Sequence, residues 1–187
     1  MRVIAGSARG TRLAAPPGKH TRPTADRVRE ALFSIIQSRF DLEYARVLDI
    51  CAGTGSLGIE ALSRGCAFCC FIESDRNALS ALKKNLSKVR FDARADLFEL
   101  DALKALNLLA ARKDQFDIVF LDPPYASNLY LVVMETLCNR SLLKVGGLFV
   151  AESDIRNPLP DHVGKFVKCD HRIYGDTVLD LYTLERE

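Results

Sequence analysis

"VLDICAGTGSLGIEAL", residues 47–62, joins two segments of different character through a glycine-rich turn. The apolar run "VLDI" is typical of a buried strand, and the residues after the turn are typical of a helix. Gly53, Gly55 and Gly58 follow the spacing G-x-G-x-x-G, in which glycines allow a tight turn and a close approach of the backbone to a ligand. This unit predicts an open α/β sheet that binds a ligand at the carboxyl ends of its strands.

Strand and helix signals continue to alternate after Tyr44. We expect strands at residues 46–50, 68–73, 95–100, 116–121 and 146–153, with helices at 55–64, 75–89, 102–112 and 128–140. Repeated units of this kind predict a mostly parallel sheet with helices on both faces. The tail differs, because its two strand-like runs, 165–175 and 176–184, predict an antiparallel hairpin.

The first 40 residues have a different composition. We expect a small hairpin at 3–13, a proline-rich loop at 15–23 and a helix at 24–40. Eight basic side chains lie here against Asp26 and Glu30, a balance of +6 in a chain whose net charge is +2. We therefore predict a basic extension at 1–40 beside a single domain at 41–187. The asymmetry indicates a polyanion-binding arm, with a solvated basic face as the alternative.

The composition narrows the class of protein. The chain has 187 residues, 48% hydrophobic and 27% charged, which is typical of a globular domain. It has neither an apolar run of roughly 20 residues nor the apolar core of a signal peptide, so we expect a cytoplasmic protein that does not contact membranes. The CxxC within "CAFCC", residues 66–70, has no second pair or nearby histidine to complete a zinc site. We expect these cysteines to be buried in a strand, and no metal.

Acidic residues mark the predicted carboxyl ends of four strands: Asp49, Glu73, Asp101 and Asp122. Asp49 beside the glycine turn is a poor neighbour for the pyrophosphate of a nicotinamide dinucleotide. It suits a ligand that carries an ammonium and a sulfonium group, such as S-adenosylmethionine. Glu73 would then accept hydrogen bonds from ribose hydroxyls, and Asp101 from an adenine amine. A nicotinamide-dependent oxidoreductase is the alternative for this turn.

"LDPPY", residues 121–125, ends the apolar run "FDIVFL" with a carboxylate, two prolines and an aromatic ring. Prolines stop a strand ladder and fix the backbone, so Asp122 and Tyr125 are held in place. This stretch is therefore a candidate site.

Together, "DICAGTGSLGIEAL", "FIESD" and "LDPPY" resemble the class I S-adenosylmethionine-dependent methyltransferases, and DPPY resembles the signature of enzymes that methylate an exocyclic or amide nitrogen. The segments "RVIAGSARGTRL", "TRPTADRVREALFSII" and "YGDTVLDLY" make the chain similar to the RsmD family of 16S rRNA guanine-N2 methyltransferases. The resemblance implies a Rossmann-like, seven-stranded α/β sheet and methylation of guanine 966. It implies a cofactor site made of Asp49, Cys51, Ala52, Gly53, Thr54, Gly55, Glu73, Ser74, Asp101, Ala102 and Asp122.

The same resemblance gives the DPPY residues a catalytic role. An aromatic amine is a poor nucleophile, because its lone pair is delocalised into the ring. The Asp122 carboxylate and the Pro123 carbonyl would accept its two N–H bonds and turn the lone pair towards the methyl group. Tyr125 would stack on the base, and Pro123 and Pro124 would keep these groups preorganised. The proton goes either to Asp122 or to water.

The predicted RNA contacts lie in the basic extension. A paired guanine hides its amine, so the target base must be unpaired or flipped out while basic side chains hold the flanking phosphates. We assign this role to five arginines: Arg9, Arg12, Arg22, Arg27 and Arg29. Ion pairs within the protein are the alternative for each, and residues 22–24 would also cover the cofactor. The expected partner of this monomer is small-subunit rRNA or the 30S ribosomal subunit.

Other activities fit parts of this pattern. Nitrogen methyltransferases that act on adenine N6 of nucleic acid or on protein glutamine also use such a motif. Only about 22 residues separate "LDPPY" from the next strand, which is too short for the target-recognition insertion of DNA enzymes, and glutamine enzymes favour Asn where this chain has Asp122. A non-catalytic RNA-binding module is disfavoured by the intact acidic and glycine positions.

Overall fold

The computed structural model describes residues 1–15, 23–123 and 129–185, with the side chains of residues 23–25 also outside the description. The strands are β1 (Arg46–Ile50), β2 (Phe68–Ile72), β3 (Ala95–Phe98), β4 (Phe116–Leu121), β5 (Leu143–Asp154), β6 (His162–Val163), β7 (Phe166–Tyr174) and β8 (Thr177–Leu184). The helices are α1 (Pro23–Arg39), α2 (Ser56–Ser63), α3 (Arg76–Val89), α4 (Ala102–Ala111) and α5 (Leu129–Asn139), with a 3₁₀ turn at Asp92–Arg94.

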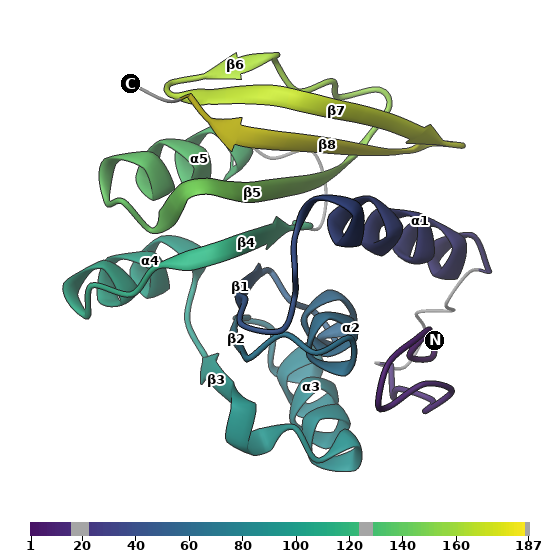
Figure 1. The fold of residues 1–187 in the computed structure, drawn as a ribbon. Helices are drawn as coiled ribbons and strands as arrows, with labels where there is room; N and C mark the ends of the chain where they lie inside the picture. Colours follow the sequence, from purple (N-terminus) through teal and green to yellow (C-terminus); the bar gives the residue numbers. More distant parts are fainter. Residues whose placement is uncertain (16–22, 124–128, 186–187) are drawn as a thin grey trace.

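The strands form one twisted sheet in the order β3-β2-β1-β4-β5-β8-β7-β6 (Figure 1). Strands β1 to β5 are parallel, whereas β8 runs antiparallel to both β5 and β7. The predicted parallel sheet with a C-terminal hairpin is therefore confirmed. The described residues contain eight strands and not the expected seven, because β6 adds a two-residue edge strand whose pairing with β7 leaves no periodic signal in the sequence.

Both faces of the sheet are apolar, which accounts for the continuous apolar runs in its strands. Alternate residues of β1 enter different cores: Val47 packs in the cluster that includes Phe33 of α1, and Leu48 in the cluster that includes Leu106 of α4. Helices α1, α2 and α3 cover one face, and α4 and α5 cover the other (Figure 1). The cysteines of "CAFCC" are buried as expected, but only Cys69 and Cys70 lie in β2, because Cys66 precedes this strand.

The N-terminal segment, residues 1–15, packs on the face of the sheet that carries α1, α2 and α3. An antiparallel bridge joins Arg2 to Arg12, as expected for a small hairpin, and Val3 and Leu13 are buried in the same cluster as these helices. The division of the chain near residue 40 stays a prediction. None of the helices in the described ranges is long and apolar enough to cross a membrane.

Candidate active site

The carboxyl ends of β1, β2 and β4 meet at one level of the sheet. Ile50 is in register with both Ile72 and Leu121, so the residues that follow these three positions start from the same edge. The chain order also changes direction here, since β2 and β3 lie on one side of β1 while β4 and β5 lie on the other. Ligands of open α/β sheets bind at such a switch point.

The glycine turn between β1 and α2 is shaped by close packing on one side and open space on the other. A Cβ added at Gly58 would come within 2.3 Å of the Phe71 ring, so this position needs glycine. Gly53 has a φ of 57°, and a Cβ there would meet no atom within 4 Å. The turn therefore exposes the backbone at Gly53 to a space that a ligand can enter.

Glu73 fastens this turn to the end of β2. Its Oε2 accepts a hydrogen bond from the Gly53 N–H at 2.7 Å, and its Oε1 accepts from the N–H groups of Ser74 at 2.7 Å and Asp75 at 2.8 Å. A carboxylate held by three backbone amides is preorganised. Its position beside Gly53 is consistent with the predicted acceptor of ribose hydroxyls.

Asp49 lies beneath the turn and is only 2% exposed. Its Oδ2 accepts a hydrogen bond from the Gly58 N–H at 2.9 Å. The pKa of this carboxyl group is raised to about 7: burial is the main cause, the Gly58 bond lowers the pKa, and the nearby charges of Asp122 and Glu73 raise it. A buried carboxylate among like charges is stabilised by a cation, so the site suits a ligand with an ammonium group.

Cys51 is the residue around which the acidic groups gather. It is half-buried, and it has a φ of 59° although it is not glycine. Burial raises the pKa of its thiol to about 12, and the carboxylates of Glu73, Asp49 and Asp122 add to this effect. Carboxylates from three strand ends are therefore close enough to act on one side chain.

The DPPY residues are only partly within the description. Asp122 is exposed at the end of β4 and Pro123 is buried. The charge of Asp122 also raises the pKa of the Tyr130 phenol, which is raised mainly by burial. Pro124 and Tyr125 lie outside the described residues, so their roles stay predictions.

Glu152 is an additional acidic residue at this edge, and sequence reasoning missed it. Leu121 is in register with Ala151, so Asp122 and Glu152 follow at the same level of adjacent parallel strands. Tyr130 donates a hydrogen bond to the Glu152 carbonyl at 2.6 Å, which fixes the backbone there. Burial raises the pKa of Glu152 to about 8, and the charge of Asp122 adds to this, while Arg29 opposes it. The acidic pattern at the strand ends continues into "GGLFVAES" and was the available signal.

Asp101 has a structural task that the sequence did not reveal. It caps α4: its carboxylate accepts a hydrogen bond from the Lys104 N–H at 3.0 Å and lies 3.1 Å from the Lys104 ammonium. These bonds lower its pKa. The neighbouring Ala102 is buried, whereas Ser74 at the end of β2 is exposed. Contact of Asp101 with an adenine amine stays a prediction.

The predicted RNA contacts divide into exposed and buried arginines. Arg29 is 4% exposed; its Nη2 donates to the Arg2 carbonyl at 2.6 Å and to Asp26 at 3.0 Å, and its Nε lies 3.7 Å from Glu60. It faces inward from α1 and is buried, so its contact with RNA stays a prediction. Its position fits the alternative, ion pairs within the protein.

Arg9, Arg12 and Arg27 are exposed, whereas Arg22 lies outside the described residues. A cavity of about 400 Å³ opens between the N-terminal segment and α1; its charged lining consists of Arg2, Arg9, Arg27, Asp26 and Glu30. Arg2 was not among the expected contacts, because its sequence neighbourhood does not reveal that it folds back beside Arg9 and Arg27. The described side chains contain no cluster of three or more residues suited to a metal ion.

The fold, with its glycine turn and acidic residues at the carboxyl ends of β1, β2 and β4, defines a methyltransferase of class I. A solved structure titled as the putative methyltransferase yhhF from Escherichia coli has a TM-score of 0.85 to this chain, with 31% identity, and the match covers 100% of this chain and 99% of that one. This likeness extends over the N-terminal segment and the C-terminal hairpin, since it leaves no part of the chain out.

The family follows from sequence comparison. The family model described as Conserved hypothetical protein 95 matches residues 1–183, and the chain belongs to this family, the RsmD family of methyltransferases. It is 40% identical to the putative rRNA methyltransferase YlbH of Bacillus subtilis over 97% of this chain and 98% of the relative. It is 33% identical to the ribosomal RNA small subunit methyltransferase D of Escherichia coli over 100% of this chain and 91% of the relative.

Proposed function

We propose that this protein methylates small-subunit rRNA, and that it transfers the methyl group of S-adenosylmethionine to the exocyclic N2 of guanine 966 in 16S rRNA. One observation carries the proposal: register brings the ends of β1, β2 and β4 to one level, where Glu73 and Asp49 bond the backbone of the glycine turn and Asp122 follows β4. This arrangement supports a cofactor at the turn and a target amine at Asp122.

The residues at the turn fit the cofactor. The open space beside the Gly53 backbone leaves room for the cofactor. Glu73 lies where ribose hydroxyls can donate hydrogen bonds to it, and Asp49 supplies negative charge for the ammonium group. Thr54 and Gly55 complete the turn between β1 and α2. When bound, the cofactor supplies a methyl group on a sulfonium, which is already strongly electrophilic.

Asp122 is the group that prepares the nucleophile. It is exposed at the edge, directly after β4, and it is followed by the buried Pro123. The Asp122 carboxylate and the Pro123 carbonyl accept the two N–H bonds of the target amine, so the nitrogen lone pair turns away from the guanine ring. Tyr125 stacks on the base. The proton lost after transfer passes to Asp122 or to water.

The basic side chains beside the N-terminal segment bind the RNA backbone. Arg9 and Arg27 line the same cavity together with Arg2, so phosphates on either side of the target nucleotide can be held there. The exposed Arg12 extends this surface. Arg29 is left out of the binding surface because it is buried.

The experiment that tests this function is methyl transfer from labelled S-adenosylmethionine to small ribosomal subunits that lack the modification, followed by nucleoside analysis. The expected product is N2-methylguanosine at position 966. Label in N6-methyladenosine would keep the reaction and overturn the target, and label only in added protein would overturn the RNA substrate. An Asp122→Ala variant is the matched control, because it should bind the cofactor and leave the RNA unlabelled.

A further inference from the structure

Asn85 joins two segments that are far apart in the sequence. It lies on α3 and is fully buried. Its Oδ1 accepts a hydrogen bond from the Ala14 N–H at 2.7 Å, and its Nδ2 donates to the Ala14 carbonyl at 3.1 Å and to the Thr54 carbonyl at 3.0 Å. One carboxamide thus holds the N-terminal segment and the glycine turn at once.

The three bonds use the particular chemistry of a carboxamide. A carboxamide offers an acceptor and two donors, and here the acceptor and one donor pair with the backbone of Ala14 as a neighbouring strand would. The second donor reaches Thr54, which lies between Gly53 and Gly55 of the turn. A buried amide that makes all three bonds is specific in geometry, and no hydrophobic side chain of its size could replace it.

A second set of bonds holds the N-terminal segment elsewhere. Glu60 of α2 accepts hydrogen bonds from the N–H groups of Ile4 at 2.7 Å and Ala5 at 3.0 Å. Ser63 donates to the Ala5 carbonyl at 2.6 Å and accepts from the Ala8 N–H at 2.9 Å. These bonds hold the first turn of the segment to the end of α2, and they do not involve the glycine turn.

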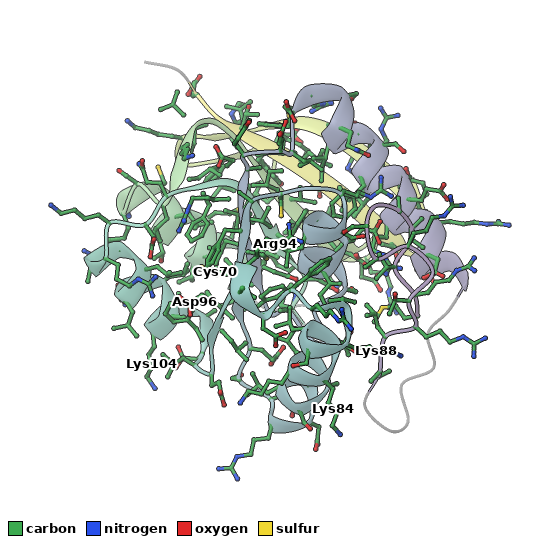
Figure 2. All side chains as sticks on the ribbon, turned by 60° about the horizontal axis from the view of Figure 1, so that its bottom comes forward. Cys70, Lys84, Lys88, Arg94, Asp96 and Lys104 are labelled. Carbon is green, nitrogen blue, oxygen red and sulfur yellow. The ribbon has the colours of Figure 1, made fainter. Side chains whose placement is uncertain are left out.

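Lys88 adds a further bond from α3. Its Nζ donates to the Arg12 carbonyl at 2.8 Å, and Figure 2 shows this side chain beside the N-terminal segment. The bond lies two residues before Ala14 in the segment and one helical turn after Asn85 in α3. Of these attachments, the Asn85 bonds are the ones that also reach the turn.

We propose that Asn85 is a positioning residue that couples occupancy of the glycine turn to the placement of the N-terminal segment on RNA. The inference rests on the proposed function. A ligand on the turn restrains Thr54, and through Asn85 it restrains Ala14, which follows the exposed Arg12, a proposed RNA contact, by two residues. Coupling of two sites is reciprocal, so RNA on the N-terminal segment strengthens cofactor binding to the same extent.

Hydrogen exchange of the Ala14 amide tests the coupling without RNA. In the wild-type protein, saturating S-adenosylhomocysteine should slow this exchange about fivefold or more. Asn85→Ala should still bind S-adenosylhomocysteine, but its Ala14 amide should exchange at the same rate with and without this ligand. The matched control Ser63→Ala loosens the segment at α2 and should keep the cofactor effect at Ala14. Wild-type protein without a cofactor effect, or a Ser63→Ala variant that loses it as fully as Asn85→Ala, would overturn the proposal.

A second variant distinguishes loss of the hydrogen bond to Thr54 from failure of the protein to fold. Asn85→Asp keeps the size of the side chain and the acceptor for the Ala14 N–H, but in its ionised form it donates to neither the Thr54 nor the Ala14 carbonyl. It should therefore lose the cofactor effect at Ala14 even if Asn85→Ala does not fold, and a normal effect in Asn85→Asp would contradict the proposal.

RNA affinity supplies an independent measurement. S-adenosylhomocysteine should tighten binding of a 16S rRNA fragment about fivefold or more in the wild type and in Ser63→Ala, and not in the Asn85 variants. Equal tightening in the Asn85 variants would overturn the coupling. The two proposals can be overturned independently. Absence of rRNA methylation, with Ala14 exchange still slowed by S-adenosylhomocysteine, would overturn the function. Methylation of rRNA without any slowing of Ala14 exchange would overturn the coupling.

Discussion

At the carboxyl edge of the sheet, Glu73 and Asp49 are held by backbone amides of the glycine turn, whereas Arg9, Arg12 and Arg27 of the N-terminal region extend into solvent. The acidic groups are preorganised because strand register and the turn fix their positions. The exposed arginines form a surface that can adjust to a flexible polyanion. In the proposed function, the first arrangement binds the small cofactor and the second binds the RNA backbone.

If the acidic residues at the carboxyl edge are preorganised, the largest effect of a substitution should be on turnover, at Asp122. Asp122→Ala should lower turnover about 10²–10³-fold, because a preorganised acceptor is lost from the transition state, while the Kd for S-adenosylhomocysteine changes little. Single-turnover methyl transfer and calorimetry measure the two quantities. Asp117→Ala is the control, since this residue lies on the same strand at the opposite edge, where it pairs with Lys144. A variant of Asp122 that loses cofactor affinity and keeps turnover would contradict the assigned role.

Arg29 should act on stability and not on RNA binding. Arg29→Ala leaves the buried Glu60 with Arg64 as its remaining ionic partner, so we expect a loss of about 3 kcal/mol, the lower end for a broken buried pair. Urea unfolding measures this free energy. The control Arg27→Ala removes an exposed side chain and should change stability by about 0.5 kcal/mol or less. Similar stability of the two variants would show that burial does not distinguish these arginines.

Asp49 should make cofactor affinity depend on pH. The ammonium group binds the ionised carboxylate, so affinity is full above the raised pKa of about 7 and falls about tenfold for each pH unit below it. Calorimetry with S-adenosylhomocysteine between about pH 5.5 and 7.5 measures this slope. Asp49→Asn should bind weakly at every pH in this range. A slope that survives in Asp49→Asn would assign the titration to another group, such as Glu152.

Asp49 should make the stability of the free protein fall as pH rises, whereas it makes cofactor affinity rise. Its pKa is raised on folding, so its contribution to stability is present below the unfolded value and is lost as pH rises through about 7. Thermal unfolding of the free protein should therefore show a lower Tm at pH 8 than at pH 6, and Asp49→Asn should reduce the difference. An unchanged difference in this variant would again point to another buried acid.

The smallest predicted effect concerns a single phosphate contact. Arg27→Ala should weaken RNA binding uniformly across sequences, and it should reduce the salt slope of log Kd by about 1. Filter binding across a salt series measures this. Lys83→Ala is a control at an exposed cation of α3, which pairs with Glu99. An unchanged slope in Arg27→Ala would remove this side chain from the binding surface.

Much of the fold could be predicted from local patterns. The limits of β1 and β4 were predicted to the residue, because the apolar run of β1 leads into the glycine turn and that of β4 lies between Gln115 and Asp122. The predicted β5 began three residues late, since its first residues, from Leu143 to Val145, lie at a register shift against β4 and lack a regular apolar pattern. The acidic residues at the strand ends were found because strand direction alone brings them to one edge.

The remaining features depend on contacts between distant parts of the chain. The burial of Arg29 results from Glu60, which lies on another helix and 31 positions later in the sequence. Glu152 became a site residue only when register placed it beside Asp122. Asn85 is an ordinary polar residue of an amphipathic helix until Ala14 and Thr54 are brought to it. Local periodicity contains no information about such partners.

Cys51 has a consequence for how the enzyme avoids damage to itself. A thiolate is a far better nucleophile than an aromatic amine, and Cys51 directly precedes the glycine turn that is the proposed cofactor site. Burial and three neighbouring carboxylates keep it as the neutral thiol, with a pKa of about 12. In the proposed function, the acidic groups that favour the cofactor's ammonium group therefore also disfavour ionisation of the thiol beside the turn.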